Sequence, residues 1–142
     1  MTRIFVPGIA APQGSKSGFI QRGRVVLVES SKKVKPWREA VAKHAKGDLL
    51  EGPLVIEVEF VMPRTKAMGT KPAPPMIQRP DLDKLIRSTC DGLTGAAYVD
   101  DSQVVTITAH KRRAEPDEPT GAYITITPLN EAGFLNGEKG MS

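Results

Sequence analysis

The chain has 142 residues and a mass of 15.4 kDa, which suits one domain with a single core and excludes two stacked enzymatic domains. Hydrophobic residues make up 39% and the net charge is +4, as in a globular rather than a disordered or fibrous protein. The one cysteine, Cys90, excludes a disulfide framework. No apolar run reaches the roughly 18 to 20 residues of a membrane span, and no signal-peptide region follows Met1. We therefore expect a cytoplasmic protein without membrane contact.

The charge is unevenly distributed along the chain. Residues 1–47 carry ten basic and two acidic side chains, whereas residues 81–101 carry two basic and five acidic ones. A basic segment beside a compact acidic one is typical of a protein that binds a polyanion with the first and a cation with the second. The alternative for the basic segment is a solvated surface that keeps the protein soluble.

The first part of the chain predicts two short strands around a polar loop. β-Branched residues concentrate at 3–6 and 24–28, and the segment between them, 8–22, reads as the loop. Within it, residues 12–18 resemble a phosphate-binding glycine loop but lack the Walker spacing of Lys and Ser, so we expect no nucleoside triphosphate site there.

The middle of the chain predicts a helix over 34–46 and a strand over 54–61. Trp37 lies on the apolar stripe of this helix together with Ala40, Val41 and His44, so we expect it to be a core anchor rather than a base-stacking residue. In the strand, apolar residues alternate with Glu57 and Glu59.

A proline-rich stretch over 62–80 predicts a long loop, because prolines prevent regular backbone hydrogen bonding. Strands are predicted over 103–111 and 122–127, with a turn at 117–121 between them. We therefore expect one α+β domain over residues 1–129, a small mixed β-sheet packed with helices, followed by a flexible C-terminal tail over 130–142.

An acidic helix is predicted to begin at Asp81 and to end near Gly95. Apolar and small residues recur on one face at helical spacing, and three polar residues share the opposite face: Asp83, Arg87 and Asp91. Asp100 and Asp101 lead into the next strand. If that strand runs back antiparallel beside the helix start, Asp101 approaches Asp81 and Asp83.

Three converging carboxylates would repel one another, and a divalent cation is the natural compensation. Hard oxygen ligands favour Mg²⁺, with Mn²⁺ as a substitute, over zinc. Such an ion activates water and neutralises charge on a phosphodiester. The alternatives are structural: Asp81 as a helix N-cap, an ion pair of Asp83 with Arg87, and Asp100-Asp101 as an ordinary turn.

These residues carry a resemblance to a known family. Residues 79–87 read Arg-Pro-Asp-Leu-Asp-Lys-Leu-Ile-Arg, residues 91–93 read Asp-Gly-Leu, and residues 100–103 read Asp-Asp-Ser-Gln. This spacing resembles that of the RusA family of Holliday junction resolvases, which are endonucleases of phage and prophage origin. The resemblance extends over most of residues 3–128.

The resemblance implies a homodimer that uses Mg²⁺ to resolve four-way DNA junctions by paired nicks during recombination and repair, in the cytoplasm of a bacterial host. It implies that Asp81, Asp83 and Asp101 are the acidic catalytic and metal-binding residues, that Asp100 is a further metal ligand, and that Asp91 supports them. Lys84 and Arg87 depart from the family pattern, which has Asn and Lys there.

Arg87 is expected to stabilise the transition state by its charge, since an arginine does not serve as a proton donor. Phosphate contacts are expected from basic residues chosen by charge and placement, namely Lys16, Arg22, Arg24, Lys32, Lys33, Lys35 and Arg79. Two other functions stay open: a catalytically impaired module that binds branched DNA, and a metal-dependent nuclease with another branched-DNA specificity.

Overall fold

The structure is a computed structural model that describes residues 1–14, 16–21, 24–29 and 32–129, the second and third of these ranges by their backbone alone. Its regular elements, in chain order, are β1 (Thr2–Pro7), β2 (Lys16–Gln21), β3 (Arg24–Glu29), α1 (Val34–Ala45), β4 (Leu54–Met62), the short 3₁₀ helix η1 (Lys66–Met68), α2 (Leu82–Leu93), the 3₁₀ helix η2 (Asp101–Gln103), β5 (Val104–Arg113) and β6 (Gly121–Pro128).

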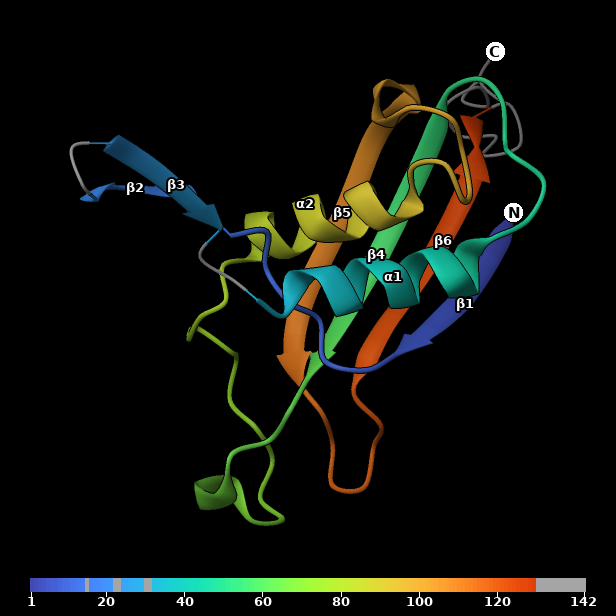
Figure 1. Ribbon diagram of the computed structural model, residues 1–142. Helices are drawn as coiled ribbons and strands as arrows, with labels where there is room; N and C mark the ends of the chain where they lie inside the picture. Colours follow the sequence, from blue (N-terminus) through green and yellow to red (C-terminus); the bar gives the residue numbers. More distant parts are fainter. Residues whose placement is uncertain (15, 22–23, 30–31, 130–142) are drawn as a thin grey trace.

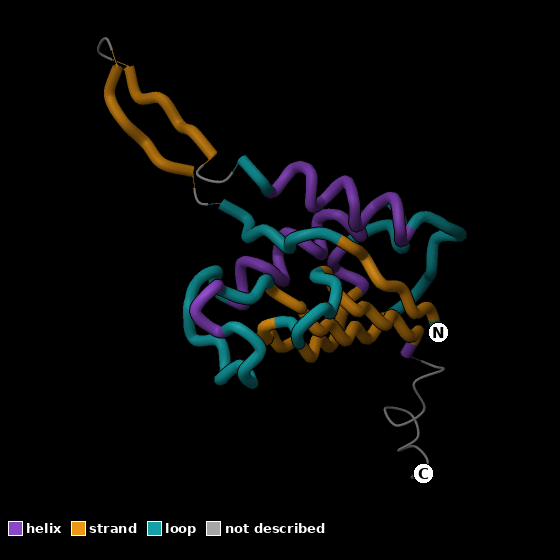
Figure 2. Tube along the Cα trace, turned by 90° about the horizontal axis from the view of Figure 1, so that it is seen from below, coloured by secondary structure: helices purple, strands orange, loops and turns teal. Residues whose placement is uncertain are grey.

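The main sheet is mixed and has the strand order β1-β6-β4-β5 (Figure 1). β6 pairs antiparallel with both β1 and β4, whereas β5 pairs parallel with β4. α1 and α2 form a second layer against one face of this sheet, as Figure 2 shows. This arrangement confirms the predicted α+β fold with a small mixed sheet. None of the described helices has the length and apolar character needed to cross a membrane.

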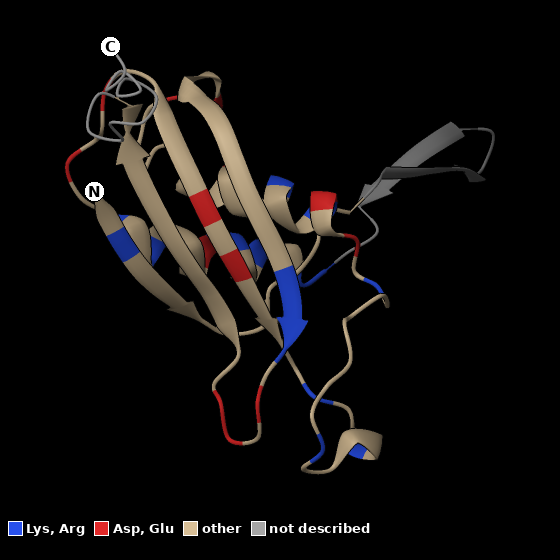
Figure 3. Ribbon diagram, turned by 180° about the vertical axis from the view of Figure 1, so that it is seen from behind, with Lys and Arg blue, Asp and Glu red and all other residues tan. Residues whose placement is uncertain are grey.

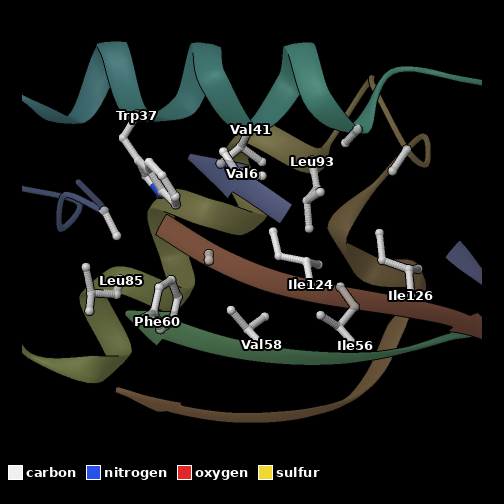
Figure 4. Close-up of a cluster of buried hydrophobic side chains, with 14 of the residues drawn as sticks. Val6, Trp37, Val41, Ile56, Val58, Phe60, Leu85, Leu93, Ile124 and Ile126 are labelled. Carbon is white, nitrogen blue, oxygen red and sulfur yellow. The ribbon is translucent and has the colours of Figure 1, made fainter. Parts of the chain in front are cut away.

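The core lies between the helices and the sheet. The alternation predicted for β4 is confirmed, because Leu54, Ile56, Val58 and Phe60 are all buried on the helix side. Trp37 is 2% exposed and points from α1 into this core (Figure 4). Its indole Nε1 donates a hydrogen bond to the hydroxyl of Thr89, so its role as a core anchor is confirmed.

The two helices pack closely where α2 carries a glycine. A Cβ atom built on Gly92 would lie 2.8 Å from the carbonyl oxygen of Arg38 and 2.9 Å from the Cβ of Val41. The glycine therefore permits the approach of α1 and α2 at this point.

Three details of the fold differ from the sequence prediction. The expected loop over 8–22 contains β2, which pairs antiparallel with β3 in a separate two-stranded sheet. His44 is exposed, and the buried stripe of α1 continues through Ala45, because positions four residues apart from Trp37 and Val41 face the sheet. The segment 114–120 is no hairpin turn, since β4 lies between β5 and β6.

The other predicted strands and both helices are confirmed within a few residues at their ends. The proline-rich stretch contains only the short helix η1, as expected of a long loop. The predicted tail over 130–142 lies outside the described residues.

Candidate active site

The acidic motif lies at the amino-terminal end of α2. Asp81 occupies the position before the first helical residue, but its side chain makes no capping hydrogen bond. Asp83 lies in the first turn, and both carboxylates are exposed. The described residues also show no ion pair between Asp83 and Arg87. The N-cap and ion-pair alternatives are therefore not borne out, and both carboxylates remain available to a ligand.

The chain before α2 is fastened to the carboxyl end of β5. Lys111 donates hydrogen bonds to the carbonyl oxygens of Gln78 at 2.6 Å and Pro80 at 2.7 Å. Arg113 donates to the carbonyl oxygen of Pro63 at 2.8 Å. Asp81 is thus positioned by the sheet as well as by its own helix.

A hollow of about 660 Å³ opens beside Asp81. Three cationic side chains, Lys33, Arg79 and Lys84, line it together with this carboxylate. The opposite wall is the segment 9–14, which is joined to α2 by two hydrogen bonds: Gln13 N to Lys84 O at 3.0 Å and Ser88 Oγ to Ala11 O at 2.6 Å. An anion that enters the hollow meets a predominantly positive surface beside an acidic group.

The structure does not bring Asp101 to the start of α2. The Asp101 carboxylate accepts hydrogen bonds from the hydroxyls of Thr94 and, at 3.0 Å, of Tyr98. Thr94 is the C-cap of α2, so the length of the helix, about 20 Å, separates Asp101 from Asp81. The expected approach of Asp101 to Asp81 and Asp83 is therefore wrong within one chain. The reason is that β5 begins beside the carboxyl end of α2.

The metal expected from the sequence does not fit a single chain. Among the described residues, no three His, Cys, Asp or Glu side chains are grouped closely enough to hold a metal ion. Asp81 and Asp83 at one end of α2, and Asp100 and Asp101 beyond its other end, form two separate pairs of carboxylates.

The surroundings of Asp101 are partly buried and polar. Burial, together with the nearby carboxylate of Asp101, raises the pKa of Cys90 to about 11, so this thiol is protonated at neutral pH. Burial also raises the pKa of Tyr98 strongly, so its hydroxyl stays a donor to Asp101. Cys90 is the small core residue predicted for it and not a nucleophile.

Asp100 caps the short helix η2. Its carboxylate accepts a hydrogen bond from the backbone N–H of Ser102 at 2.9 Å, which lowers its pKa. The side chain of Gln103 accepts from the N–H groups of Val99 and Asp100 and donates to the carbonyl of Leu50. This capping box fixes the turn in which Asp101 is presented.

Asp91 lies in the last turns of α2 and faces α1. Its carboxylate is 3.7 Å from the guanidinium of Arg38. This ion pair joins the two helices, so the structure shows a positioning contact for the residue that was expected to support the site.

The expected phosphate contacts fall into two groups. Lys32, Lys33, Lys35 and Arg79 are exposed, and Lys33 and Arg79 line the hollow beside Asp81. The side chains of Lys16, Arg22 and Arg24 lie outside the described residues. Figure 3 shows that basic residues also mark the carboxyl end of β5, beside the acidic start of α2.

Sequence reasoning missed two contributors to the site. Lys111 fastens the loop before Asp81, yet it follows a strand pattern that gives no sign of this contact. Lys84 lines the hollow, although in sequence it stood out only as a departure from a family pattern. By contrast, Arg112 is held by Glu59 at 3.0 Å and by Glu118 at 2.8 Å, and is not merely a solvated strand end.

Comparison with known proteins identifies the family. No curated protein matches the chain. The family model described as endodeoxyribonuclease RusA matches residues 10–127, a range that includes the hollow, α2 and both pairs of carboxylates. Because this match covers most of the chain, the protein belongs to the RusA family of endodeoxyribonucleases.

Proposed function

We propose that this protein is a Mg²⁺-dependent endodeoxyribonuclease that resolves four-way DNA junctions by paired nicks, acting as a homodimer. The observation that carries this proposal is the hollow at the start of α2, where Asp81 lies among Lys33, Arg79 and Lys84. The cations suit the phosphates of a DNA strand, and the carboxylates suit chemistry at one of them. The reaction is proposed to serve recombination and repair in a bacterial cytoplasm.

Each described residue has a role in this proposal. Lys33, Arg79 and Lys84 bind the phosphates that flank the scissile bond. Arg87, exposed one turn after Asp83, neutralises charge that develops on the phosphate. Mg²⁺, for which Mn²⁺ is proposed to substitute, supplies water activation and charge neutralisation when it is bound. Its proposed oxygen ligands are Asp81, Asp83, Asp100 and Asp101.

The experiment is strand-specific nicking of a synthetic four-way junction and of a linear duplex of the same sequence, with Mg²⁺, Mn²⁺ or EDTA. We expect metal-dependent, paired nicks in the junction alone. Asp83→Asn is expected to abolish them and to retain junction binding. Asp48→Asn, a change of an exposed aspartate in the loop after α1, is the matched control and is expected to cut normally.

Two results would replace this proposal by its alternatives. Tight junction binding without nicks under any metal condition would indicate a catalytically impaired branched-DNA-binding module. Faster cutting of flaps or replication forks than of four-way junctions would indicate a nuclease of another branched-DNA specificity.

A further inference from the structure

The middle of β5 is an exposed strand edge without charge. β5 is the last strand of the main sheet, and residues 105–108 are all exposed. Val105 is 56% exposed and Ile107 is 38% exposed. Proteins usually protect an exposed edge with charged residues or prolines, and an edge without them is a template for pairing with another strand.

The apolar side chains of this edge share one face of the sheet. Ile107 is in register with Ile56, whose side chain is buried beneath the helices. Val105 and Ala109 lie on the same side as Ile107, because side chains alternate along a strand. The edge therefore presents an apolar row on the helix side of the sheet.

The two ends of β5 carry opposite charges. Asp100 and Asp101 precede its first residue, whereas Lys111, Arg112 and Arg113 end it. Two copies of β5 that pair antiparallel place the acidic end of each strand against the basic end of the other. This complementarity favours a second copy of the chain as the partner. A DNA strand along the same edge would meet no cation between residues 104 and 109.

We propose that the edge of β5 pairs antiparallel with β5 of a second copy, and that this pairing places Asp81 and Asp83 of one copy beside Asp100 and Asp101 of the other. The meaning of the joint site rests on the proposed nuclease function, but the pairing itself does not. It explains why the two pairs of carboxylates are separated by the length of α2 within one chain.

The register follows from the faces of the strand. A two-fold axis normal to the sheet keeps both helix layers on one side, so residues of the helix face must lie opposite one another. With Ile107 on the axis, Val105 faces Ala109 and Gln103 faces Lys111 of the other copy. Lys111 holds Pro80 at 2.7 Å, so Asp81 lies at this level of the joined sheet. Asp101 of the second copy is two residues from Gln103, within reach of the start of α2.

The first test of the pairing is a disulfide across the axis. Directly opposed residues of antiparallel strands have Cα atoms about 4.5–5.5 Å apart, which suits a disulfide bond. Ile107→Cys is therefore expected to form a covalent dimer under mild oxidation. Cys90, with its raised pKa, is expected to stay reduced. Glu57→Cys, on the exposed opposite face of β4, is the control and is expected to remain unlinked.

The second test is the oligomeric state measured by light scattering. The unmodified chain is expected to be a dimer, and Ile107→Lys a folded monomer with an unchanged circular dichroism spectrum. Tyr123→Lys, at an exposed position of β6, is expected to remain dimeric. A monomeric unmodified chain, or a dimer of Ile107→Lys without crosslinking of Ile107→Cys, would overturn the proposed pairing.

The third test mixes Asp83→Asn with Asp101→Asn chains. If the site is shared between copies, one of the two sites in each mixed dimer is intact, and random exchange restores about one quarter of the wild-type sites. If each site lies within one copy, no mixed dimer has an intact site. Restored single nicks support the proposal, and their absence in a crosslinkable dimer contradicts the shared site. An inactive wild-type chain would instead refute the nuclease function, while the first two tests still decide the pairing.

Discussion

The indole Nε1 of Trp37 donates a hydrogen bond of 3.1 Å to the hydroxyl oxygen of Thr89, and both residues are buried between α1 and α2. The bond joins helices 52 residues apart in sequence. It satisfies the one polar atom of the indole in the core. Because α2 carries Asp81 and Asp83 at its start, this contact helps to fix the helix that presents them.

We expect Thr89→Val to lower the free energy of unfolding by about 1–3 kcal/mol, since it leaves the buried indole N–H without its acceptor while the shape is nearly kept. Urea denaturation followed by Trp37 fluorescence measures this change. Thr125→Val, the same substitution on the outer face of β6, is the control and is expected to change stability by less than about 0.5 kcal/mol. Equal stability of the two variants would contradict the importance of this bond.

Gly92→Ala is expected to destabilise the protein by about 1–3 kcal/mol, because the added methyl group meets the Arg38 carbonyl and the side chain of Val41. Thermal unfolding provides the measurement. In Gly47→Ala the nearest atom is 4.0 Å from the new Cβ, so this control is expected to be neutral or slightly stabilising. A neutral Gly92→Ala would show that α1 and α2 can move apart without loss.

The ion pair of Glu118 with Arg112 predicts a pH dependence of stability. Arg112 donates two hydrogen bonds of 2.8 Å to Glu118, which lowers the pKa of Glu118 from 4.5 to about 2. Because the folded-state pKa is the lower one, its contribution is fully present above about pH 4.5 and is lost as the pH falls towards 2.

Glu118→Gln is therefore expected to be less stable than the wild type by about 1 kcal/mol at pH 7, with a smaller difference at pH 3. Urea denaturation at both pH values measures the difference. Glu57→Gln, which changes an exposed glutamate of β4, controls for the general effect of charge. A gap between Glu118→Gln and wild type that is as large at pH 3 as at pH 7 would exclude the ion pair as its cause.

Arg87→Gln is expected to lower the single-turnover rate of junction cleavage by about 100-fold, since it removes a cation from the charge that develops on the phosphate. Arg87→Lys is expected to retain most of the rate near pH 7, where lysine is also charged. Lys43→Gln removes an exposed cation of α1 away from the hollow and is expected to cut normally. If Arg87→Gln cuts as fast as the wild type, Arg87 takes no part in the chemistry.

Local patterns predicted most elements because they are set by local physics. The alternation in β4 and the apolar stripe of α2 determine which side of each is buried. β2 was missed because a short strand with Gly18 in its interior shows no clear alternation. Its pairing with β3 depends on the neighbouring strand.

The motif at 79–87 predicted which end of α2 carries the chemistry, but not where Asp101 lies. Its position depends on the direction in which β5 leaves the helix, and β5 follows β4 in parallel. Spacing along the chain contains no information on this choice. The latch of Lys111 on Pro80 is likewise a contact between distant segments and has no local signature.

The sheet order also constrains how the protein folds as it is synthesised. β6, the last strand in the chain, lies between β1 and β4 and provides the hydrogen-bonding partner of both. The main sheet therefore cannot close until residue 128 has left the ribosome. Until then, β1 and one edge of β4 lack their partner, so nascent chains depend on late, long-range pairing that is intrinsically slow.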